Sequence, residues 1–325
     1  MAEITFLEAL RQGLREEMAR DERVFILGED VGAYGGAFKV TEGLFQQFGA
    51  DRVIDTPIAE AAIVGAAAGA AHMGMRPVAE MQFIDFISCA YDMLTNYVAT
   101  ARYRAGLPTP MVVRGPCGGY VRGGPFHSQN PEAAFLHTPG LKIVYPATAR
   151  DAKGLIKSAI RDDDPVLYLE HKWLYRRIKE DLSESDEILT PIGSARVARE
   201  GKDLSIITYG ATVWKSLEAA EQLAAAGVDV EILDLRTLLP LDDEAIEATV
   251  KKTNKVLIVH EDTRTGGLAG EIAARINERV FEWLDGPIMR VTAHDVPLPY
   301  APTLEDFVLP QTDDIVKAAR WLAAY

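Results

Sequence analysis

Glu60 is the first residue of the sequence with a type and setting suited to acid–base chemistry. It lies in the segment 55-DTPIAEAAIVGAAAGAA-71 and is the only charged residue from Pro57 to Ala71, where most side chains are small and apolar. The spacing predicts a helix over 57–73, with Thr56 as its N-cap and Pro57 at its first position. A carboxylate in the first helical turn is stabilised by the helix dipole, so Glu60 could be a helix-start charge. The alternative is an acid placed beside a ligand that needs one, and composition leaves both interpretations open.

His127 is the second candidate for acid–base work. It lies in the loop 115-GPCGGYVRGGPFHSQN-130, where glycines precede it and polar residues follow it. Loops at a sheet edge often carry catalytic histidines, but a lone histidine is also commonly structural or exposed. A similar choice exists at His260 and Glu261, which end a predicted strand just before a helix start: this is either an anion-binding terminus or a structural feature.

Other polar side chains are predicted to follow strands of the same sheet. Glu29 ends the first strand, and Gln82 follows the strand over 77–81. The carboxyl ends of parallel strands meet at one edge, so these residues are expected to converge with Glu60 and His127 on one pocket. Phe86, shortly after Gln82, is either a core residue or a ring face for a planar ligand.

Several common site chemistries are excluded by motif. The 26 glycines include no G-x-G triplet, so the dinucleotide fingerprint is missing. No phosphate loop of the G-x-x-x-x-G-K-[ST] type, no H-E-x-x-H, no G-x-S-x-G and no C-x-x-C occurs. Glycine–aspartate dipeptides are absent as well.

The elements that must position these residues alternate between strand and helix along most of the chain. The alternation predicts an α/β fold of two domains, 1–185 and 186–325, each a mostly parallel sheet flanked by helices. A helix is expected from Thr5 to Ala19 with a Thr5–Glu8 capping box, and a long helix over 84–104. The charged segment 172–190 is predicted to be a surface linker.

The composition limits the class of protein further. The 325 residues are 48% hydrophobic and 25% charged, with no apolar run long enough for a membrane span. The formal net charge of −14 argues against binding nucleic acids or anionic membranes. Two cysteines, Cys89 and Cys117, give no disulfide framework. With a charged N-terminal segment that does not resemble a leader, these features predict a cytoplasmic protein.

Several long segments, in the same order, resemble the beta chain of the thiamine-diphosphate-dependent decarboxylating component of 2-oxo acid dehydrogenase complexes. The resemblance runs nearly end to end and places the chain in the transketolase-like superfamily. It rests on 27-LGEDVGAYGGAFKVTEGL-44, 55-DTPIAEAAIVGAAAGAA-71, 76-RPVAEMQF-83, 123-GGPFHSQNPEAAFLHTPGLK-142, 151-DAKGLIKSAIRDDDPV-166 and 295-DVPLPYAP-302.

This resemblance implies a role for each candidate. Glu60 matches the glutamate that hydrogen-bonds the cofactor's aminopyrimidine, and Phe86 matches the aromatic residue that stacks on it. Gln82 and Ile58 match residues that line the pocket, and Glu29 matches an acid in a polar channel thought to link two active sites. Since thiamine diphosphate works as a carbon nucleophile, an acid beside the pyrimidine serves as a proton relay.

The resemblance also implies His127 as the histidine near the substrate carbonyl and the lipoyl arm. Some relatives hold a potassium ion. The positions that match its ligands in this chain are Met111, Ala159, Ile160, Asp162 and Asp164. These residues would bind the ion largely through their backbone carbonyl oxygens. Asp164 departs from the family pattern, in which asparagine is usual, so occupation of this site is left open.

The partners are implied in the same way. The motif that binds the diphosphate and its Mg²⁺ starts with Gly-Asp-Gly, which this chain lacks, so an alpha subunit is expected to supply it in an α2β2 heterotetramer. Asp285 and the Tyr325 carboxylate match positions that dock the subunit-binding domain of the dihydrolipoyl acyltransferase core. The expected substrate is pyruvate or a branched-chain 2-oxo acid, with an acetoin dehydrogenase beta subunit or a non-catalytic scaffold chain as alternatives.

Overall fold

The computed structural model describes residues 3–182 and 187–325. They form two compact units, and each unit combines two separate stretches of the sequence. The first unit is Met1–Cys117 with His137–Ile192, and the second is Gly118–Leu136 with Gly193–Tyr325. The predicted domain boundary at 185/186 lies outside the described residues. The loop with His127 thus belongs to the second unit, although most of the chain before it belongs to the first.

The first unit is built on a parallel sheet. Its strands are β2 (Val24–Gly28), β3 (Val53–Asp55), β4 (Arg76–Glu80), β5 (Val112–Cys117), β6 (Lys142–Val144) and β7 (Val166–His171). They lie in the order β6-β7-β5-β4-β2-β3, and each neighbouring pair is parallel. Every residue of β2, β5 and β7 is buried, which requires cover on both faces, as is usual in parallel sheets.

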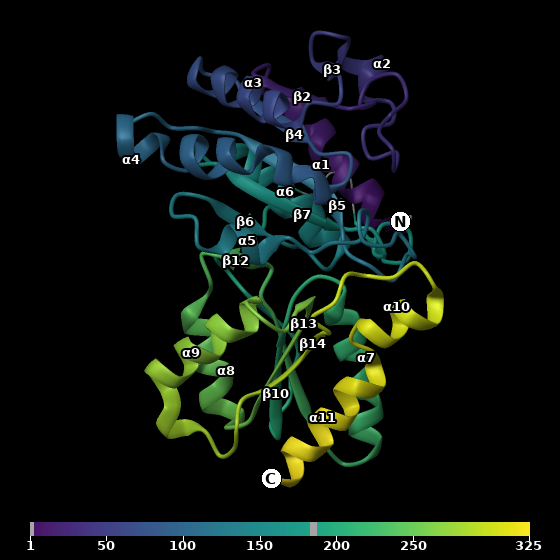
Figure 1. Ribbon diagram of the computed structural model, residues 1–325, viewed down its shortest axis with the longest axis vertical. Coiled ribbons are helices and arrows are strands. Elements are labelled where there is room, and N and C mark those ends of the chain that lie inside the picture. Colours follow the sequence, from purple (N-terminus) through teal and green to yellow (C-terminus); the bar gives the residue numbers. More distant parts are fainter. Residues whose placement is uncertain (1–2, 183–186) are drawn as a thin grey trace. The chain divides into compact units, whose positions relative to one another are not determined.

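Helices supply that cover. They are α1 (Phe6–Arg20), α2 (Leu44–Phe48), α3 (Glu60–His72), α4 (Ala101–Ala105) and α6 (Ala149–Arg161). The predicted capping box at the start of α1 is confirmed, since Thr5 and Glu8 exchange both hydrogen bonds. Helices α1 and α6 pack closely, because a Cβ atom at Gly13 would come within 2.5 Å of Ile156. Helix α3 packs against β4 (Figure 1).

The prediction of one long helix over 84–104 is wrong, because this segment forms three short helices of different types. The segment is divided into the 3-10 helix η1 (Ile84–Ala90), the π-helix η2 (Met93–Val98) and α4. Side chains here compete with the helical backbone bonds. Thr95 donates to the carbonyl of Tyr91 and Thr100 to that of Asn96, the back-bonding that bends helices.

The segment 172–190 is more than the predicted surface linker. It contains β8 (Lys179–Asp181), which pairs antiparallel with β1 (Glu3–Thr5). Tyr175, Leu182 and Ile188 are buried. The apolar residues follow neither a helical nor a strand period, which is why the sequence pattern hides them among the charges.

The second unit has its own sheet, with strands in the order β14-β13-β10-β11-β9. The pairs are parallel except for β11 with β9. The strands of this sheet are β9 (Arg196–Arg199), β10 (Leu204–Thr208), β11 (Val230–Asp234), β13 (Val256–Thr263) and β14 (Met289–Ala293). The short strand β12 (Thr237–Leu239), from the same stretch of the chain, is not part of it. The predicted fold class, α/β with two mostly parallel sheets flanked by helices, is confirmed.

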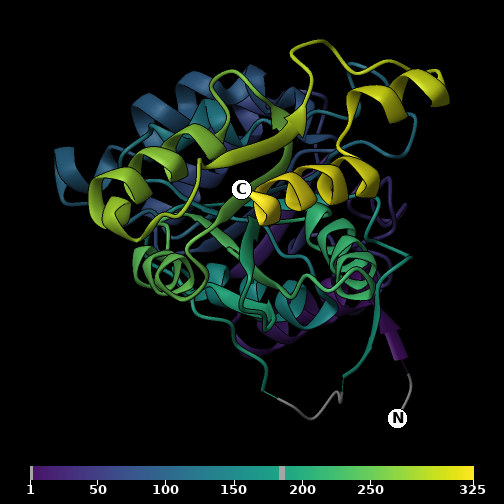
Figure 2. The same ribbon diagram turned by 90° about the horizontal axis from the view of Figure 1, so that it is seen from below.

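Helices cover both faces of this second sheet. Helices α8 and α9 lie on one face, and α7 and α11 lie on the other (Figure 1). Figure 2 shows α11 next to α7, which it contacts along its length. The helices are α5 (Glu132–Leu136), α7 (Thr212–Ala225), α8 (Asp243–Thr253), α9 (Leu268–Val280), η3 (Phe281–Trp283), α10 (Pro302–Val308) and α11 (Thr312–Ala324). In the part of the chain that the structure describes, no helix has both the length and the apolar character to cross a bilayer.

Candidate active site

Glu60 is the first residue of α3. The helix therefore begins three residues later than predicted, and the N-cap is Ala59, which makes no side-chain capping bond. The expectation for Thr56 is wrong. Its amide donates to the carbonyl of Gly28 at 2.9 Å, and its buried hydroxyl oxygen has no hydrogen-bond partner. As the first residue of α3, Glu60 places its carboxyl group at the positive end of the helix dipole. Its side chain is only half-buried, so a ligand can still reach it.

Glu29 lies beside Glu60, directly after β2. Its pKa is raised by burial first, then by the negative charges of Glu60 and Asp30. Gln82, which follows β4, donates from Nε2 to a carboxylate oxygen of Asp30 at 3.1 Å. The structure thus brings Glu29, Glu60 and Gln82 together at the carboxyl edge of the sheet, as predicted.

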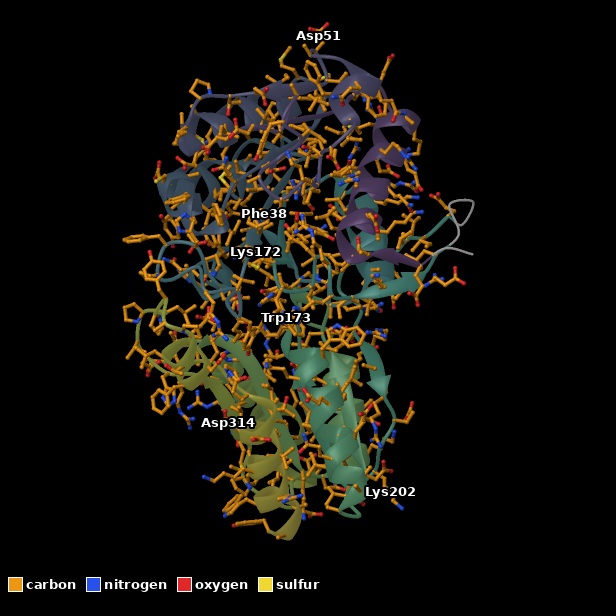
Figure 3. All side chains as sticks on the ribbon, turned by 90° about the vertical axis from the view of Figure 1, so that its right-hand side faces the viewer. Phe38, Asp51, Lys172, Trp173, Lys202 and Asp314 are labelled. Carbon is orange, nitrogen blue, oxygen red and sulfur yellow. The ribbon has the colours of Figure 1, made fainter. Side chains whose placement is uncertain are left out.

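Phe86, the aromatic candidate, lies in η1, the helix that follows β4 and Gln82 along the chain. Phe86 is half-buried, so part of its ring remains exposed. Phe83 has a structural role, since Phe38 packs edge-on against it with centroids 5.3 Å apart and Lys172 Nζ lies 5.9 Å from its ring (Figure 3 labels Phe38 and Lys172). Ile58, a predicted pocket residue, is 82% exposed in this chain.

One face of α3 is apolar, small-sided and exposed. It comprises Ala61, Ala62, Ala66, Gly69 and Met73. Gly65 and Gly69, two glycines of α3, have different surroundings. A Cβ atom at Gly65 would lie 3.4 Å from the methyl group of Met93 inside the unit, whereas Gly69 faces open space.

A buried charge network, which sequence reasoning missed, lies next to Glu29. Arg114 donates to both carboxylate oxygens of Glu170, at 2.5 and 2.6 Å, and also to Glu80. The Tyr175 hydroxyl donates to Glu170 at 2.7 Å. Burial raises the pKa of Glu80 to about 6, although the charge of Arg114 opposes the rise. Charged residues inside the apolar strands RPVAE, VVRG and LYLEH were the available signal.

His127 is half-buried in a loop that the second unit holds firmly. Asn130 donates to a carboxylate oxygen of Glu261 at 2.9 Å, and the amide of Gly119 donates to the same oxygen. Gly124 has a φ of +69°, and a Cβ atom there would lie 2.3 Å from the Tyr300 ring, so only glycine fits. These contacts tie the loop to the rest of the second unit. The predicted convergence of His127 with Glu60 stays a prediction.

An acidic cavity of about 510 Å³ adjoins this loop within the second unit. Its lining includes Gln129, Asn130, Glu261, Asp262 and Asp295. Burial raises the pKa of Asp262 to about 6. A cavity with three carboxyl groups is unsuited to an anion.

His260 fits the structural interpretation rather than the anion-binding one. It is fully buried, its ring stacks on Tyr209 at 6.0 Å, and burial lowers its pKa to about 4. The segment before α9 already has a carboxylate, because Asp295 accepts from the amide and the hydroxyl of Thr265 at 2.9 and 2.7 Å.

The five positions implied for potassium lie around the end of α6 and the start of β5, but most of their carbonyl groups already accept hydrogen bonds. Met111 accepts from Val166 at 3.0 Å, and Ala159 from Asp162 at 3.3 Å. Arg76 donates to the carbonyls of both Ile160 and Asp162 at 2.9 Å. The Asp164 carboxylate pairs with Arg102. Within residues 3–182 and 187–325, no group of three or more His, Cys, Asp or Glu side chains could hold a metal ion.

The two predicted docking residues lie close together in the second unit. Asp285 is exposed, and its neighbour Gly286 packs against Tyr325, since a Cβ atom there would lie 3.1 Å from the tyrosine ring. Tyr325 is 65% exposed and packs against Trp321 with ring centroids 5.3 Å apart. A carboxylate and exposed aromatic rings therefore share one small surface.

Comparison with known proteins decides the family. Residues 2–177 match the pyrimidine-binding domain family of transketolase, and residues 193–315 match the transketolase C-terminal domain family. The chain is 50% identical to the 2-oxoisovalerate dehydrogenase subunit beta of Bacillus subtilis (strain 168), with both chains covered in full. It is 44% identical to the pyruvate dehydrogenase E1 component subunit beta of the same organism, with 98% of each covered.

The chain belongs to the family of 2-oxo acid dehydrogenase beta subunits. A solved structure, a split-gene transketolase described as an inactive beta4 tetramer, matches 99% of each chain with a TM-score of 0.81 at 23% identity, and so supports the fold alone. The two domain families and the two beta-subunit relatives confirm the resemblance found in the sequence. The roles of the individual residues in this beta subunit remain predictions.

Proposed function

We propose that this beta subunit binds the aminopyrimidine of thiamine diphosphate through Glu60 and supports the oxidative decarboxylation of a 2-oxo acid, with transfer of the acyl group to lipoyl. The observation that carries the proposal is the pair of neighbouring acids, Glu60 and Glu29, at the carboxyl edge of the first sheet. An acid at a helix start needs no second acid beside it. A carboxyl group whose pKa is raised by burial and by a neighbouring acid, as that of Glu29 is, suits a site that holds and moves a proton.

The donor set of this edge suits a flat, nitrogen-rich ring. Glu60 would share a proton with a ring nitrogen, Phe86 would offer its exposed ring face, and Gln82 is held in place by its hydrogen bond to Asp30. When bound, thiamine diphosphate supplies a nucleophilic carbon that attacks the carbonyl group of the 2-oxo acid. The chain's own contribution would be a Glu60 carboxyl oxygen that exchanges a proton with the ring nitrogen.

His127 is proposed to act on the substrate or on the lipoyl group as a proton donor. Its loop is held by Glu261 and closed by Gly124 against Tyr300, so its position is defined before any ligand arrives. A fixed donor spares the entropy cost of ordering a mobile loop during the reaction.

The alpha subunit is proposed to cover the exposed apolar face of α3 and to hold the diphosphate with its Mg²⁺, in an α2β2 assembly. Met73, at one end of this face, is 85% exposed, and Ile58, just before α3, is 82% exposed. Apolar surface of this kind favours a partner, because burying it is worth about 25 cal/mol per Å². Covering this face would also exclude water from the start of α3, where Glu60 lies.

The acyltransferase core is proposed to dock on the surface formed by Asp285, Trp321 and Tyr325. The carboxylates would pair with basic side chains, and the aromatic rings would supply the apolar contact that anchors many interfaces. Asp285→Ala should weaken binding of the core's subunit-binding domain, with decarboxylation by the α2β2 enzyme unchanged. Asp313→Ala, at an exposed acid near the start of α11, is the control.

The substrate is the open part of the proposal, since the relatives include both 2-oxoisovalerate and pyruvate enzymes. The chain should be co-expressed with its alpha subunit and assayed with an artificial electron acceptor against 2-oxoisovalerate, pyruvate and acetoin. Turnover of a 2-oxo acid is expected. Turnover of acetoin alone would point to an acetoin dehydrogenase, and no turnover with a properly assembled pair would point to a scaffold. A cytoplasmic location is proposed with this function.

A further inference from the structure

The positions that the family resemblance implies for potassium are surrounded by basic side chains of the chain itself. Arg76 donates from Nη1 to the carbonyls of Ile160 and Asp162, both at 2.9 Å. Its side chain is only 14% exposed. A guanidinium group that bridges two carbonyl oxygens takes the place that a bound cation would have between them.

The charges around this point balance one to one. Arg76 pairs with Asp163 at 2.7 Å, and Arg102 pairs with Asp164. Lys142 pairs with Asp162 at 2.7 Å and reaches Asp164 at 3.5 Å. The six-residue charge cluster therefore consists of three basic and three acidic side chains: Arg76, Arg102, Lys142, Asp162, Asp163 and Asp164.

A further cation would have to enter this balanced cluster. Any ion touching the two carbonyl oxygens that Arg76 contacts would lie no more than about 6 Å from its guanidinium nitrogen. At an effective dielectric of about 20, repulsion from the charge of Arg76 at that distance corresponds to roughly a 100-fold loss of binding. The three acids that could offset this repulsion are already paired with basic side chains of the cluster. The residues present thus do not fit a potassium ion.

We propose that Arg76, Arg102 and Lys142 replace the monovalent cation in this protein, so that the end of α6 is held by the chain's own charges and the assembly needs no potassium. The guanidinium of Arg76 ties α6 to β4, and Arg102 ties the same corner to α4. This is a structural site, and the proposal is independent of the substrate.

The test is the thermal unfolding of the co-purified alpha/beta assembly in KCl and in choline chloride at equal ionic strength. The midpoint should differ by less than about 1 °C between the two salts. A potassium-specific rise of about 3 °C or more, the size expected for an ion well above its dissociation constant, would overturn the proposal.

Variants make the result specific to Arg76. Arg76→Gln removes the charge but keeps an amide donor, and it should create a potassium-specific rise that the wild type lacks. Arg76→Lys keeps the charge and should create none. Arg104→Gln, at an exposed arginine on the same helix as Arg102, is the matched control. Its unfolding midpoint, like that of the wild type, should not be higher in KCl than in choline chloride. An Arg76→Gln variant with no potassium response would contradict the claim that Arg76 holds the cation's place.

Discussion

Removing Arg114 should destabilise the first unit strongly, and more so at high pH than at low pH. Arg114 is 1% exposed and donates to Glu80 and Glu170, which are 4% and 0% exposed. Arg114→Leu leaves two buried carboxyl groups facing each other. Breaking a buried ion pair from one side costs about 3–5 kcal/mol, and Arg114 is the partner of both carboxyl groups, so the upper half of that range is expected at pH 8.

The pH dependence follows from Glu80. Its pKa in the folded protein is raised from 4.5 to about 6, so it favours folding below pH 4.5 and loses that contribution as the pH rises through about 6. The difference between these two pKa values corresponds to about 2 kcal/mol in the free energy of unfolding. Without Arg114, whose charge holds the pKa of Glu80 down, the loss should extend to higher pH. At pH 5 the variant, with Glu80 protonated, should therefore lose less stability than at pH 8.

Urea unfolding of the purified chain, followed by circular dichroism at pH 5 and pH 8, measures this effect. Arg104→Leu, at an exposed arginine, is the control, with an expected change within about 0.5 kcal/mol. Adding Glu80→Gln to Arg114→Leu should recover part of the stability at pH 8. A loss below about 1 kcal/mol for Arg114→Leu at pH 8, or an equal loss at both pH values, would refute the reasoning.

Four further substitutions test other parts of the structure. Thr5→Ala should cost about 1 kcal/mol by removing the capping box, whereas Thr56→Ala, at a hydroxyl with no partner, should cost less than about 0.5 kcal/mol in the same urea titration. Gly124→Ala should lower the thermal midpoint by several degrees, because its φ and the Tyr300 contact both exclude a side chain; an unchanged midpoint would mean the loop is not held as described. Glu60→Gln should lower the pKa of Glu29, followed by carbon NMR of the labelled carboxyl group, since the charge of Glu60 helps to raise it; an unshifted pKa would separate the two acids.

Local chemistry predicts some elements of this fold and not others. The Thr5–Glu8 capping box and the strand–helix alternation follow from short-range patterns, and the structure confirms both. The start of α3 does not follow from such a pattern. Thr56 and Pro57 have the right types for a helix start, but the Thr56 amide bonds to Gly28, which keeps this segment extended beyond β3.

The candidate site shows the same division. The grouping of Glu29, Glu60 and Gln82 follows from the rule that parallel strands share a carboxyl edge. The Arg114 network does not follow, because no local pattern says which buried charges pair across β4, β5 and β7. Nor does the packing of 84–104, which depends on threonine side chains that can bond either to solvent or to the helix backbone.

The role of Glu60 is the central claim, and one measurement tests it most directly. The wild-type chain and Glu60→Gln should each be assembled with the alpha subunit, and decarboxylation and thiamine diphosphate affinity should be measured in parallel. Loss of a proton-transfer group is expected to lower kcat by about 100-fold or more, with the cofactor still bound, since glutamine preserves shape and one hydrogen bond. Near-normal turnover of the Glu60→Gln enzyme would contradict the account.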